Sequence, residues 1–228
     1  MAHIRNEAET RELYRKILTA ATALFMQKGF EKTTLMDIAK LSGVSKRVII
    51  YEMNSKEELL GHLVTKFLDG VTEASNNVAT KLTDDRILIF TANEVLQIYM
   101  AEMSEDMRNL YLAGYSMPKT SELVLKRRST MLYENFGDMF PDLELKDFYE
   151  IEIASMGIMR AYMSVPCDMY FTLEAKTDRL ITTMLKIYNI DDETIKQTKE
   201  LIGKIDFETV AKKAVEGVFN ELEIKINK

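Results

Sequence analysis

Apolar and polar residues follow a helical period along most of this chain. Between residues 11 and 28, apolar residues recur every three or four positions, as at Leu13, Ile17, Ala20 and Leu24, and so share one helix face. Gly29 follows and is suited to ending this helix. No segment shows the strict alternation of apolar and polar residues that indicates a half-buried strand. The pattern therefore predicts an all-α fold.

Residues 34–53 predict two short helices around a tight turn. Thr34 can cap the first helix, and Asp37, three residues later, completes a capping-box pattern. Gly43 can turn the chain at positive φ, and Ser45 can cap the second helix. This spacing indicates a helix-turn-helix motif, in which the second helix lies in the major groove of DNA.

Longer helices are expected after this motif. Ser55 and Glu58 match a second capping box, and apolar residues continue at helical spacing to Val71. Further helices are expected at about 86–103, 107–117, 121–139, 145–164, 172–188, 191–204 and 207–223. We predict an N-terminal three-helix DNA-binding domain at residues 11–70 and a helical effector-binding and dimerisation domain at residues 71–228.

The predicted helix at 86–103 is apolar on most sides and is expected to be buried. Asn93, Glu94 and Gln97 interrupt its apolar surface. Their position leaves two alternatives open, because such residues face either a polar group of a ligand or solvent.

The composition limits the possible classes of protein. No apolar run approaches the ~20 residues that cross a membrane, and the N-terminus lacks the apolar core of a signal peptide. A single cysteine, Cys167, allows no internal disulfide and suits a reducing cytoplasm. We therefore expect a cytoplasmic protein that makes no contact with a membrane.

The net charge of −6 is unevenly divided along the chain. Residues 1–62 carry ten Lys and Arg against eight Asp and Glu, a balance of +2, which leaves −8 for residues 63–228. The positive charge is therefore at the helix-turn-helix end, where it suits DNA phosphate. The excess is small, so it supports a DNA-binding role without establishing one.

The flanks of the motif make the pattern more specific. They read ILTAATALFMQKGFEKTT before it and SKEELL after it, around DIAK and GVSK. This stretch resembles the TetR family of bacterial transcriptional regulators, from about Arg11 to Gly70. The resemblance implies a double-stranded DNA operator as partner, a small-molecule effector and a homodimer.

The motif and the resemblance together indicate the DNA-contacting residues. The first turn of the second helix is nearest to base edges, and Arg47 there could bond guanine bidentately. Lys56 aligns with the phosphate-binding lysine that is usual in the family. The hydroxyls and amides at the start of the first helix suit a phosphate. The candidates are Thr33, Thr34, Ser45, Lys46, Arg47, Tyr51 and Lys56.

The end of the second helix departs from the family pattern. Ile50 stands where the family has a phosphate-contacting tyrosine, Glu52 where an aromatic residue or histidine is common, and Met53 where phenylalanine is usual. Ile50 cannot bond phosphate, and Glu52 would repel it. Either the helix docks differently, with Tyr51 in place of the family's phosphate-contacting tyrosine, or the affinity of the protein for DNA is modest.

An effector pocket is expected among methionine and aromatic residues of the second domain, since methionine adapts to varied apolar shapes and tyrosine adds a polar tip. The alternative is that these side chains are ordinary core. The candidates are Tyr99, Met103, Met107, Tyr111, Tyr115, Tyr133, Phe136, Met156, Met159 and Met163.

Two helices are expected to form a four-helix dimer interface, as in TetR-like proteins. Small residues recur on the first of them, where they allow a close approach of another helix, and the second carries an apolar stripe. The candidates are Ala154, Gly157, Ala161, Leu180, Ile181, Met184 and Tyr188. The alternative is a dimer through the last helix, at Val210, Ala214, Val218 and Phe219.

The leading interpretation is a ligand-responsive transcriptional regulator, more typically a repressor that a small molecule releases from its operator. The alternative is a TetR-like module that binds a ligand or a protein and binds DNA weakly. An enzyme is disfavoured, because His3, His62 and Cys167 offer little for a nucleophile–base pair. We expect no metal site and no cofactor.

Overall fold

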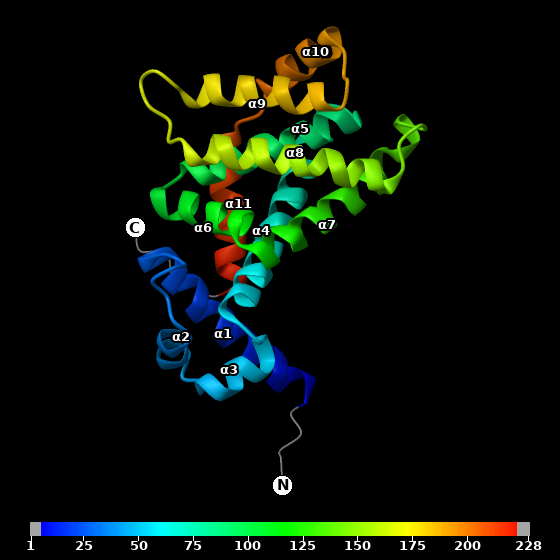
Figure 1. Ribbon diagram of the computed structural model, residues 1–228. Coiled ribbons are helices and arrows are strands. Elements are labelled where there is room, and N and C mark those ends of the chain that lie inside the picture. Colours follow the sequence, from blue (N-terminus) through cyan, green and yellow to red (C-terminus); the bar gives the residue numbers. More distant parts are fainter. Residues whose placement is uncertain (1–5, 223–228) are drawn as a thin grey trace.

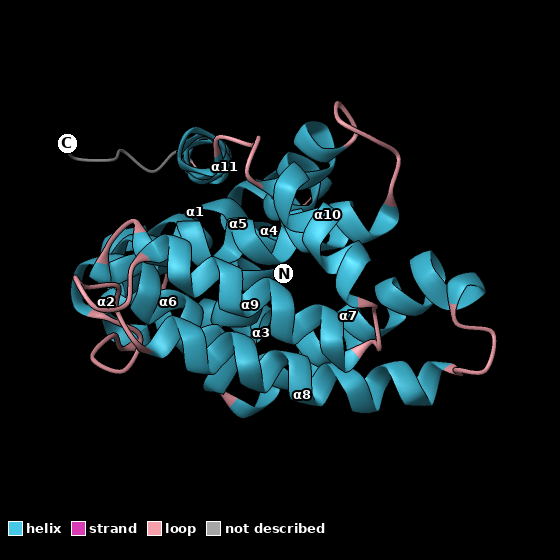
Figure 2. Ribbon diagram, turned by 90° about the horizontal axis from the view of Figure 1, so that it is seen from above, coloured by secondary structure: helices cyan, strands magenta, loops and turns pink. Residues whose placement is uncertain are grey.

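The computed structural model describes residues 6–222, which form eleven α-helices, a single 3-10 turn and no strand (Figures 1 and 2). The predicted all-α fold is confirmed. None of the helices in this range is long and apolar enough to cross a membrane. The helices are α1 (Glu7–Lys28), α2 (Leu35–Ser42), α3 (Lys46–Met53), α4 (Lys56–Ala79), α5 (Arg86–Glu102), α6 (Glu105–Ser116), α7 (Pro118–Phe136), α8 (Leu145–Ser164), α9 (Leu173–Ile187), α10 (Asp192–Ile202) and α11 (Phe207–Glu221).

Local capping explains where the first helices begin. α1 starts four residues before its predicted position, because Asn6 and Glu9 form a capping box there. Thr34 and Asp37 form the predicted capping box of α2, with Thr34 N donating to Asp37 Oδ2 at 2.8 Å. Gly43 turns the chain at a φ of 68°, a conformation that favours glycine.

The start of α4 is only partly as predicted. The Ser55 hydroxyl caps the helix by accepting from Glu58 N at 3.1 Å. The carboxylate of Glu58 instead accepts from Asn54 Nδ2 at 2.8 Å. Asn54 has a φ of 50°, so the chain turns sharply between α3 and α4.

A small apolar core holds α1 to α4 together. Ile17, Ile38, Ile49 and Leu59, one from each of these helices, are all 0% exposed. The helix-turn-helix is therefore packed on α1 and on the first turns of α4. Because α4 continues to Ala79, the same helix also reaches the larger group of helices, α5 to α11 (Figure 1).

α4 packs tightly in this larger group. A Cβ built at Gly114 of α6 would lie 2.8 Å from Val64 Cγ2 of α4, so the two helices approach more closely than a larger residue would allow. α11 runs beside α4 and α5, back toward α1 (Figure 1). At its end, the Thr19 hydroxyl of α1 donates to the carbonyl oxygen of Leu222 at 2.5 Å.

A carboxylate of α4 caps α7. Met117, the residue before α7, offers no side-chain cap, and Pro118 occupies the first turn. The Oε1 atom of Glu57 accepts instead from the backbone N–H of Lys119 at 2.5 Å and of Thr120 at 3.4 Å. The first turn of α4, next to the helix-turn-helix, is thereby joined to the start of α7.

Candidate nucleic-acid interface and buried polar cluster

The surface of α3 presents charged and aromatic side chains to solvent. Lys46 and Arg47 occupy its first two positions and are exposed, and Tyr51 is 83% exposed. Ser45 is also exposed, and its hydroxyl caps the helix by accepting from Val48 N at 3.4 Å. α3 lies at the opposite end of the molecule from α9 and α10 (Figure 1). This arrangement suits insertion of one helix into the major groove.

The two threonines before α2 differ in their placement. Thr34 is exposed, and its hydroxyl is engaged in the capping box with Asp37, to whose Oδ2 it donates at 2.7 Å. Thr33 is 1% exposed, and its hydroxyl donates to the carbonyl oxygens of Gly29 (2.8 Å) and Leu24 (3.2 Å). The expected phosphate contact through the Thr33 side chain is therefore not supported, because that side chain stabilises the turn between α1 and α2.

Lys56 is half-buried and bound to the turn before α2. Its Nζ donates to the carbonyl oxygens of Phe30 at 2.7 Å and Glu31 at 3.4 Å, and lies 4.1 Å from the centre of the Phe30 ring. An ammonium group has three N–H donors. One donor is therefore left for a phosphate, while the other two stabilise the turn.

Two exposed lysines at this end were not among the predicted contacts. Lys32 lies in the turn between α1 and α2, and Lys40 lies in the last turn of α2. Both are close in sequence to the helix-turn-helix, so their charge was visible. The sequence did not predict the exposure of these two lysines, because the surface lysines of this segment do not recur at helical spacing.

The ten predicted effector-contacting residues do not line one common cavity. Tyr111 and Tyr115 line a cavity of about 10 Å³ between α4 and α6. Met103 and Tyr133 are each 41% exposed. Tyr99 stacks on Phe207 of α11, with ring centres 5.4 Å apart. The other methionines of the prediction, Met107, Met156, Met159 and Met163, are buried between 0% and 8% exposed.

Phe136 alone of these ten lines the two cavities that surround the end of α7. A pocket of about 260 Å³ lies between α4, α5 and α7, lined by Thr72, Asn76, Thr80, Arg86, Ile89, Phe90, Asn93, Met131, Leu132, Asn135 and Phe136. A smaller cavity of about 20 Å³ is lined by Ile87, Phe90, Leu132, Phe136, Phe140, Leu185, Tyr188 and Ile190. Phe90, Leu132 and Phe136 line both, so the pocket and the cavity adjoin at these three side chains.

A buried ionic cluster lies beside these cavities. Arg128 of α7 donates from Nη2 to Glu94 Oε1 of α5 and from Nε to Glu152 Oε2 of α8, both at 2.7 Å. The three residues are between 0% and 4% exposed. Tyr188 donates from its hydroxyl to the other oxygen of Glu152 at 3.0 Å. The second oxygen of Glu94 is buried without a hydrogen-bond partner.

The polar residues of α5 extend this cluster. Asn93, Glu94 and Gln97 are 8%, 2% and 0% exposed, so the alternative that they face solvent is wrong. Tyr115 donates to Gln97 Oε1 at 2.6 Å, and Gln97 Nε2 donates to Asn93 Oδ1 at 3.1 Å. The network thus runs from the pocket of about 260 Å³, which Asn93 lines, into the larger group of helices.

The pKa values of this cluster reflect its burial. Burial raises the pKa of Glu94, against the opposing effect of the Arg128 guanidinium. Burial also raises the pKa of Tyr188, and the neighbouring Glu152 carboxylate adds to this shift. Glu94 therefore takes up a proton more readily than an exposed glutamate, while Tyr188 stays a hydrogen-bond donor across the physiological range.

The sequence carries a signal for this cluster in the spacing of its apolar residues. Arg128 lies between the apolar residues Val124 and Leu132, and Glu152 lies between Phe148 and Met156, each four residues apart. A charged residue at a position of the buried stripe is rare unless it is paired. The two charges of opposite sign on two such stripes could therefore have been matched with each other.

Comparison with known proteins bears on the N-terminal part of the chain. Residues 17–63 match the family described as "Bacterial regulatory proteins, tetR family". The probable HTH-type transcriptional regulator YttP of Bacillus subtilis is 36% identical over 77 residues, which cover 32% of this chain and 37% of YttP. The HTH-type transcriptional regulator TtgR of Pseudomonas putida is 36% identical over 75 residues, covering 33% of this chain and 34% of TtgR. The matches span about a third of each relative's length.

Residues 17–63 are thus similar to the TetR family. The fold of the whole chain resembles that of RolR, solved in complex with resorcinol, with a TM-score of 0.64 and 15% identity over 87% of this chain and 97% of RolR. RolR without ligand has a TM-score of 0.58 at 14% identity, covering 83% of this chain and 96% of that one. At these identities the likeness concerns the fold alone.

The departures from the TetR pattern in α3 have different structural settings. Met53 is 1% exposed and belongs to the small core, so it can replace a phenylalanine there. Ile50 is 42% exposed and therefore stands on the surface, next to the more exposed Tyr51. Glu52 is half-buried. α3 thus exposes an aromatic side chain at position 51, where Tyr51 is 83% exposed, and an aliphatic one at position 50.

The predicted TetR-like dimer interface divides into two parts. Ala154, Gly157 and Ala161 are exposed on α8, and a Cβ at Gly157 would meet nothing within 4 Å. The stripe of α9 is instead buried inside the chain, with Leu180, Ile181, Met184 and Tyr188 between 0% and 8% exposed. These four side chains are therefore not available to a partner subunit, because they pack against α5 and α8 of their own chain.

The alternative interface on the last helix is also covered. Ala214, Val218 and Phe219 of α11 are between 5% and 9% exposed, and Phe219 contacts Phe67 of α4 edge to face. The apolar side of α11 thus belongs to the core. Of the two alternatives, the small-residue face of α8 is the one that remains uncovered.

Proposed function

We propose that this protein is a DNA-binding transcription regulator whose affinity for its operator responds to a small molecule. The observation that carries the proposal is the exposed α3 of a TetR-type domain, with Lys46, Arg47 and Tyr51 at its surface. Ser45 and Thr34 complete the set of exposed candidates at this end. Because its partner is chromosomal DNA, we place its action in the cytoplasm.

The proposal includes two domains and a homodimer. Residues 11–70 would contact DNA, and residues 71–228 would bind the effector and the second subunit through the small-residue face of α8. A dimer places two copies of α3 on successive turns of one face of the duplex, ~34–36 Å apart. A repressor is the favoured form, since binding of an effector that changes this separation would release both half-sites.

The ligand response rests on the fold of the second domain. RolR, which shares this fold, was solved in complex with resorcinol. The buried polar cluster and the adjoining cavities support a ligand site in the same group of helices here. The link to DNA would pass through α4, which joins both parts, and through Glu57, which connects its first turn to α7.

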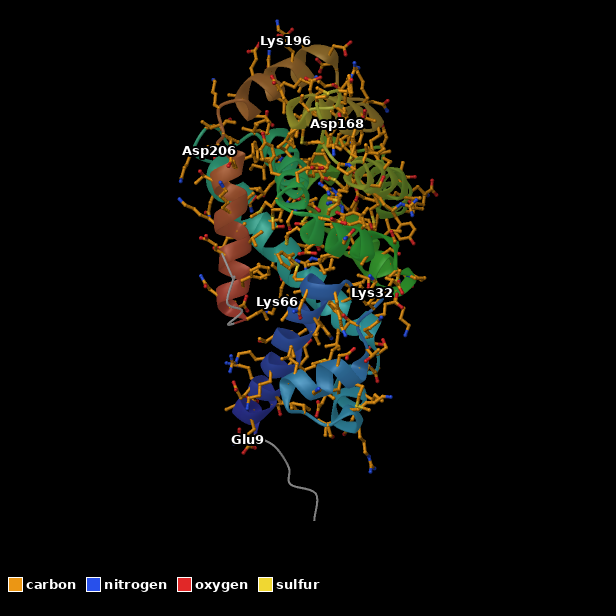
Figure 3. All side chains as sticks on the ribbon, turned by 90° about the vertical axis from the view of Figure 1, so that its left-hand side faces the viewer. Glu9, Lys32, Lys66, Asp168, Lys196 and Asp206 are labelled. Carbon is orange, nitrogen blue, oxygen red and sulfur yellow. The ribbon has the colours of Figure 1, made fainter. Side chains whose placement is uncertain are left out.

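The test is a salt series of DNA binding. Fluorescence anisotropy would follow a labelled duplex from the region upstream of the protein's own gene, with a scrambled duplex as reference. Arg47→Ala should weaken specific binding by ~1–3 kcal/mol, and Lys46→Ala should lower the salt slope by about one. Lys196→Ala, at the far end of the molecule (Figure 3), is the matched control. Equal binding of both duplexes at every salt concentration would contradict the proposal.

The second candidate function is a TetR-like module that binds a ligand or a protein and binds DNA weakly. The exposed Ile50 favours it, because this side chain can donate nothing to a phosphate. The same titration distinguishes the two functions, since a regulator retains sequence-specific binding near physiological salt. Ile50→Tyr should tighten DNA binding by ~1 kcal/mol if α3 docks as in the family, about the net value of one hydrogen bond.

A further inference from the structure

The last helix, α11, connects the end of α5 to α1. α11 begins at Phe207, whose ring stacks on Tyr99 in the last turn of α5 with ring centres 5.4 Å apart. Its 15 residues span ~22 Å at the helical rise per residue. At the other end, the carbonyl oxygen of Leu222 accepts from the Thr19 hydroxyl of α1 at 2.5 Å. α11 therefore reaches from the larger group of helices to the helix on which the helix-turn-helix packs (Figure 1).

α11 is packed along α4 in the opposite direction. Glu221 pairs with Lys66, and Val218 lies beside Gly70, so residue numbers rise along α4 as they fall along α11. A Cβ built at Gly70 would lie 3.1 Å from Val218 Cγ2, which is closer than an ordinary contact. The course of α11 toward α1 is thus held by close packing on α4.

Thr19 lies on the side of α1 that faces away from the small core. At 3.6 residues per turn, Thr19 is rotated by ~200° from Ile17, which is 0% exposed in that core. Leu222, the acceptor of the Thr19 hydroxyl, is 1% exposed. α1 is therefore held by the helix-turn-helix and α4 on one side, and by the end of α11 on another.

The position of this contact bears on the orientation of α3. α2 packs on α1, and α3 packs on α2 and on the start of α4, so these helices move together. Their continuous connection to the larger group of helices is α4. A body joined along one axis can still rotate about that axis, whereas a contact away from the axis opposes the rotation. The bond between Thr19 and Leu222 is such a contact, and the packing of α6 on α1 adds to it.

We propose that α11 is a strap that fixes the orientation of α1 to α3, with Thr19 as the positioning residue on which it acts. The part of the proposal that concerns DNA rests on the proposed function, which it deepens by naming a second route between the two parts of the chain. A displacement of α11 at α5 would reach α1 at Thr19 as well as through α4. The direction of the recognition helix thus depends on where α11 ends.

The experiment measures orientation directly. Pulsed dipolar EPR spectroscopy would give the distance between nitroxide labels at Lys32→Cys and Lys196→Cys in the full chain, with Cys167→Ser to remove the native thiol. Lys32 follows α1 and Lys196 lies on α10, and both are exposed (Figure 3). Excess unlabelled protein ensures that the two labels measured belong to one chain. The chain with native Thr19 should give a single narrow distribution of distances.

Thr19→Val keeps the shape of the side chain and removes its hydroxyl. It should widen the distribution about two-fold and weaken binding to the duplex from upstream of the gene by about 3–10-fold, because only a fraction of the molecules then hold α3 in the matching orientation. DNA binding is measured in chains without labels. Phe219→Ala, which removes the ring contact with Phe67, should widen the distribution further.

Thr22→Val is the matched control. Thr22 lies on the same helix, but its hydroxyl donates to the carbonyl oxygen of Leu18 in α1 itself, at 2.8 Å. Thr22→Val therefore removes a hydrogen bond from α1 without releasing α11, and it should leave the distribution of distances unchanged. The comparison separates a loss of orientation from a loss of stability, which thermal unfolding of both variants would report.

Two outcomes would overturn the proposal. One is an unchanged distribution in both Thr19→Val and Phe219→Ala, and the other is an equal widening in Thr22→Val. A protein whose distribution widens as expected, but which binds the upstream and scrambled duplexes equally, would contradict the proposed function and leave the strap supported. Selective DNA binding together with unchanged distances in the variants would contradict the strap alone.

Discussion

Removal of the Arg128 side chain is expected to be one of the most destabilising single changes in the larger group of helices. Arg128→Met keeps the length and apolar part of the side chain, while it removes both of its ion pairs. Glu94 and Glu152 would then be left as two buried carboxylates without a cation between them. Each must either bear an uncompensated charge or take up a proton.

The contacts set the size of this effect. At an effective dielectric constant of ~20, two opposite charges with centres ~4 Å apart attract by ~4 kcal/mol, so two such pairs contribute ~8 kcal/mol before opposing terms. Repulsion between the carboxylates and the desolvation of three charged groups reduce this sum. Removing one partner of a buried pair typically costs ~3–5 kcal/mol. We expect a loss of ~4 kcal/mol for Arg128→Met, equivalent to a fall in Tm of ~8–16 °C for a chain of this size.

Urea unfolding at fixed protein concentration would measure this loss at pH 7 and pH 5, at low and high salt. The loss should be smaller at pH 5, because burial raises the pKa of Glu94 and this carboxylate is then more readily protonated. It should change little with salt, because buried pairs are weakly screened. Arg127→Met is the control, since Arg127 pairs with Asp69 at the surface and should contribute less than ~1 kcal/mol. The triple variant with Glu94→Leu and Glu152→Leu should recover much of the stability. A loss below ~1 kcal/mol, equal at both pH values, would refute this reasoning.

Three further changes test other parts of the structure. Glu57→Ala removes the carboxylate that caps α7 and should lower the free energy of unfolding by ~1 kcal/mol, or Tm by ~2–4 °C. Glu73 is exposed on α4, the helix that also carries Glu57, so Glu73→Ala is the control and should leave Tm unchanged. Gly157→Leu should leave the protomer folded, because nothing lies within 4 Å of its Cβ position, but the variant should be monomeric in analytical ultracentrifugation. Gly217 of α11 has equally open surroundings, so Gly217→Leu is the control and should remain dimeric. Since burial raises the folded-state pKa of Glu94, its stabilising contribution is complete below the unfolded pKa of ~4.5 and is lost as the pH rises through the folded value. The free energy of unfolding of the wild type should therefore fall relative to Glu94→Gln between pH 4.5 and 7, and a rise would contradict the assigned direction.

The helix-turn-helix could be derived from the sequence because its determinants are local. The capping box of Thr34 and Asp37, the turn at Gly43 and the cap at Ser45 each act over at most four residues. Such short-range interactions can be read from neighbouring residues without knowing which helices pack together. α1 starts four residues before its apolar pattern does, because the capping box of Asn6 and Glu9 consists of polar residues outside that pattern.

Periodicity determined which faces are buried but not what buries them. The stripe of α9 was found correctly, yet its four residues pack inside the chain instead of against a second subunit. An apolar stripe has the same period in both situations. Thr33 illustrates the same limit at one residue, since its polar side chain suggested a surface contact while its neighbours enclose it.

The buried cluster was decided by the tertiary structure alone. The sequence showed that Glu94 interrupts an apolar helix, but its cation, Arg128, is 34 residues away on α7 and the second carboxylate is a further 24 residues along on α8. Packing of α5, α7 and α8 brings these charges to hydrogen-bonding distance. Local spacing carries no information on such pairs, because they depend on which helices become neighbours when the chain folds.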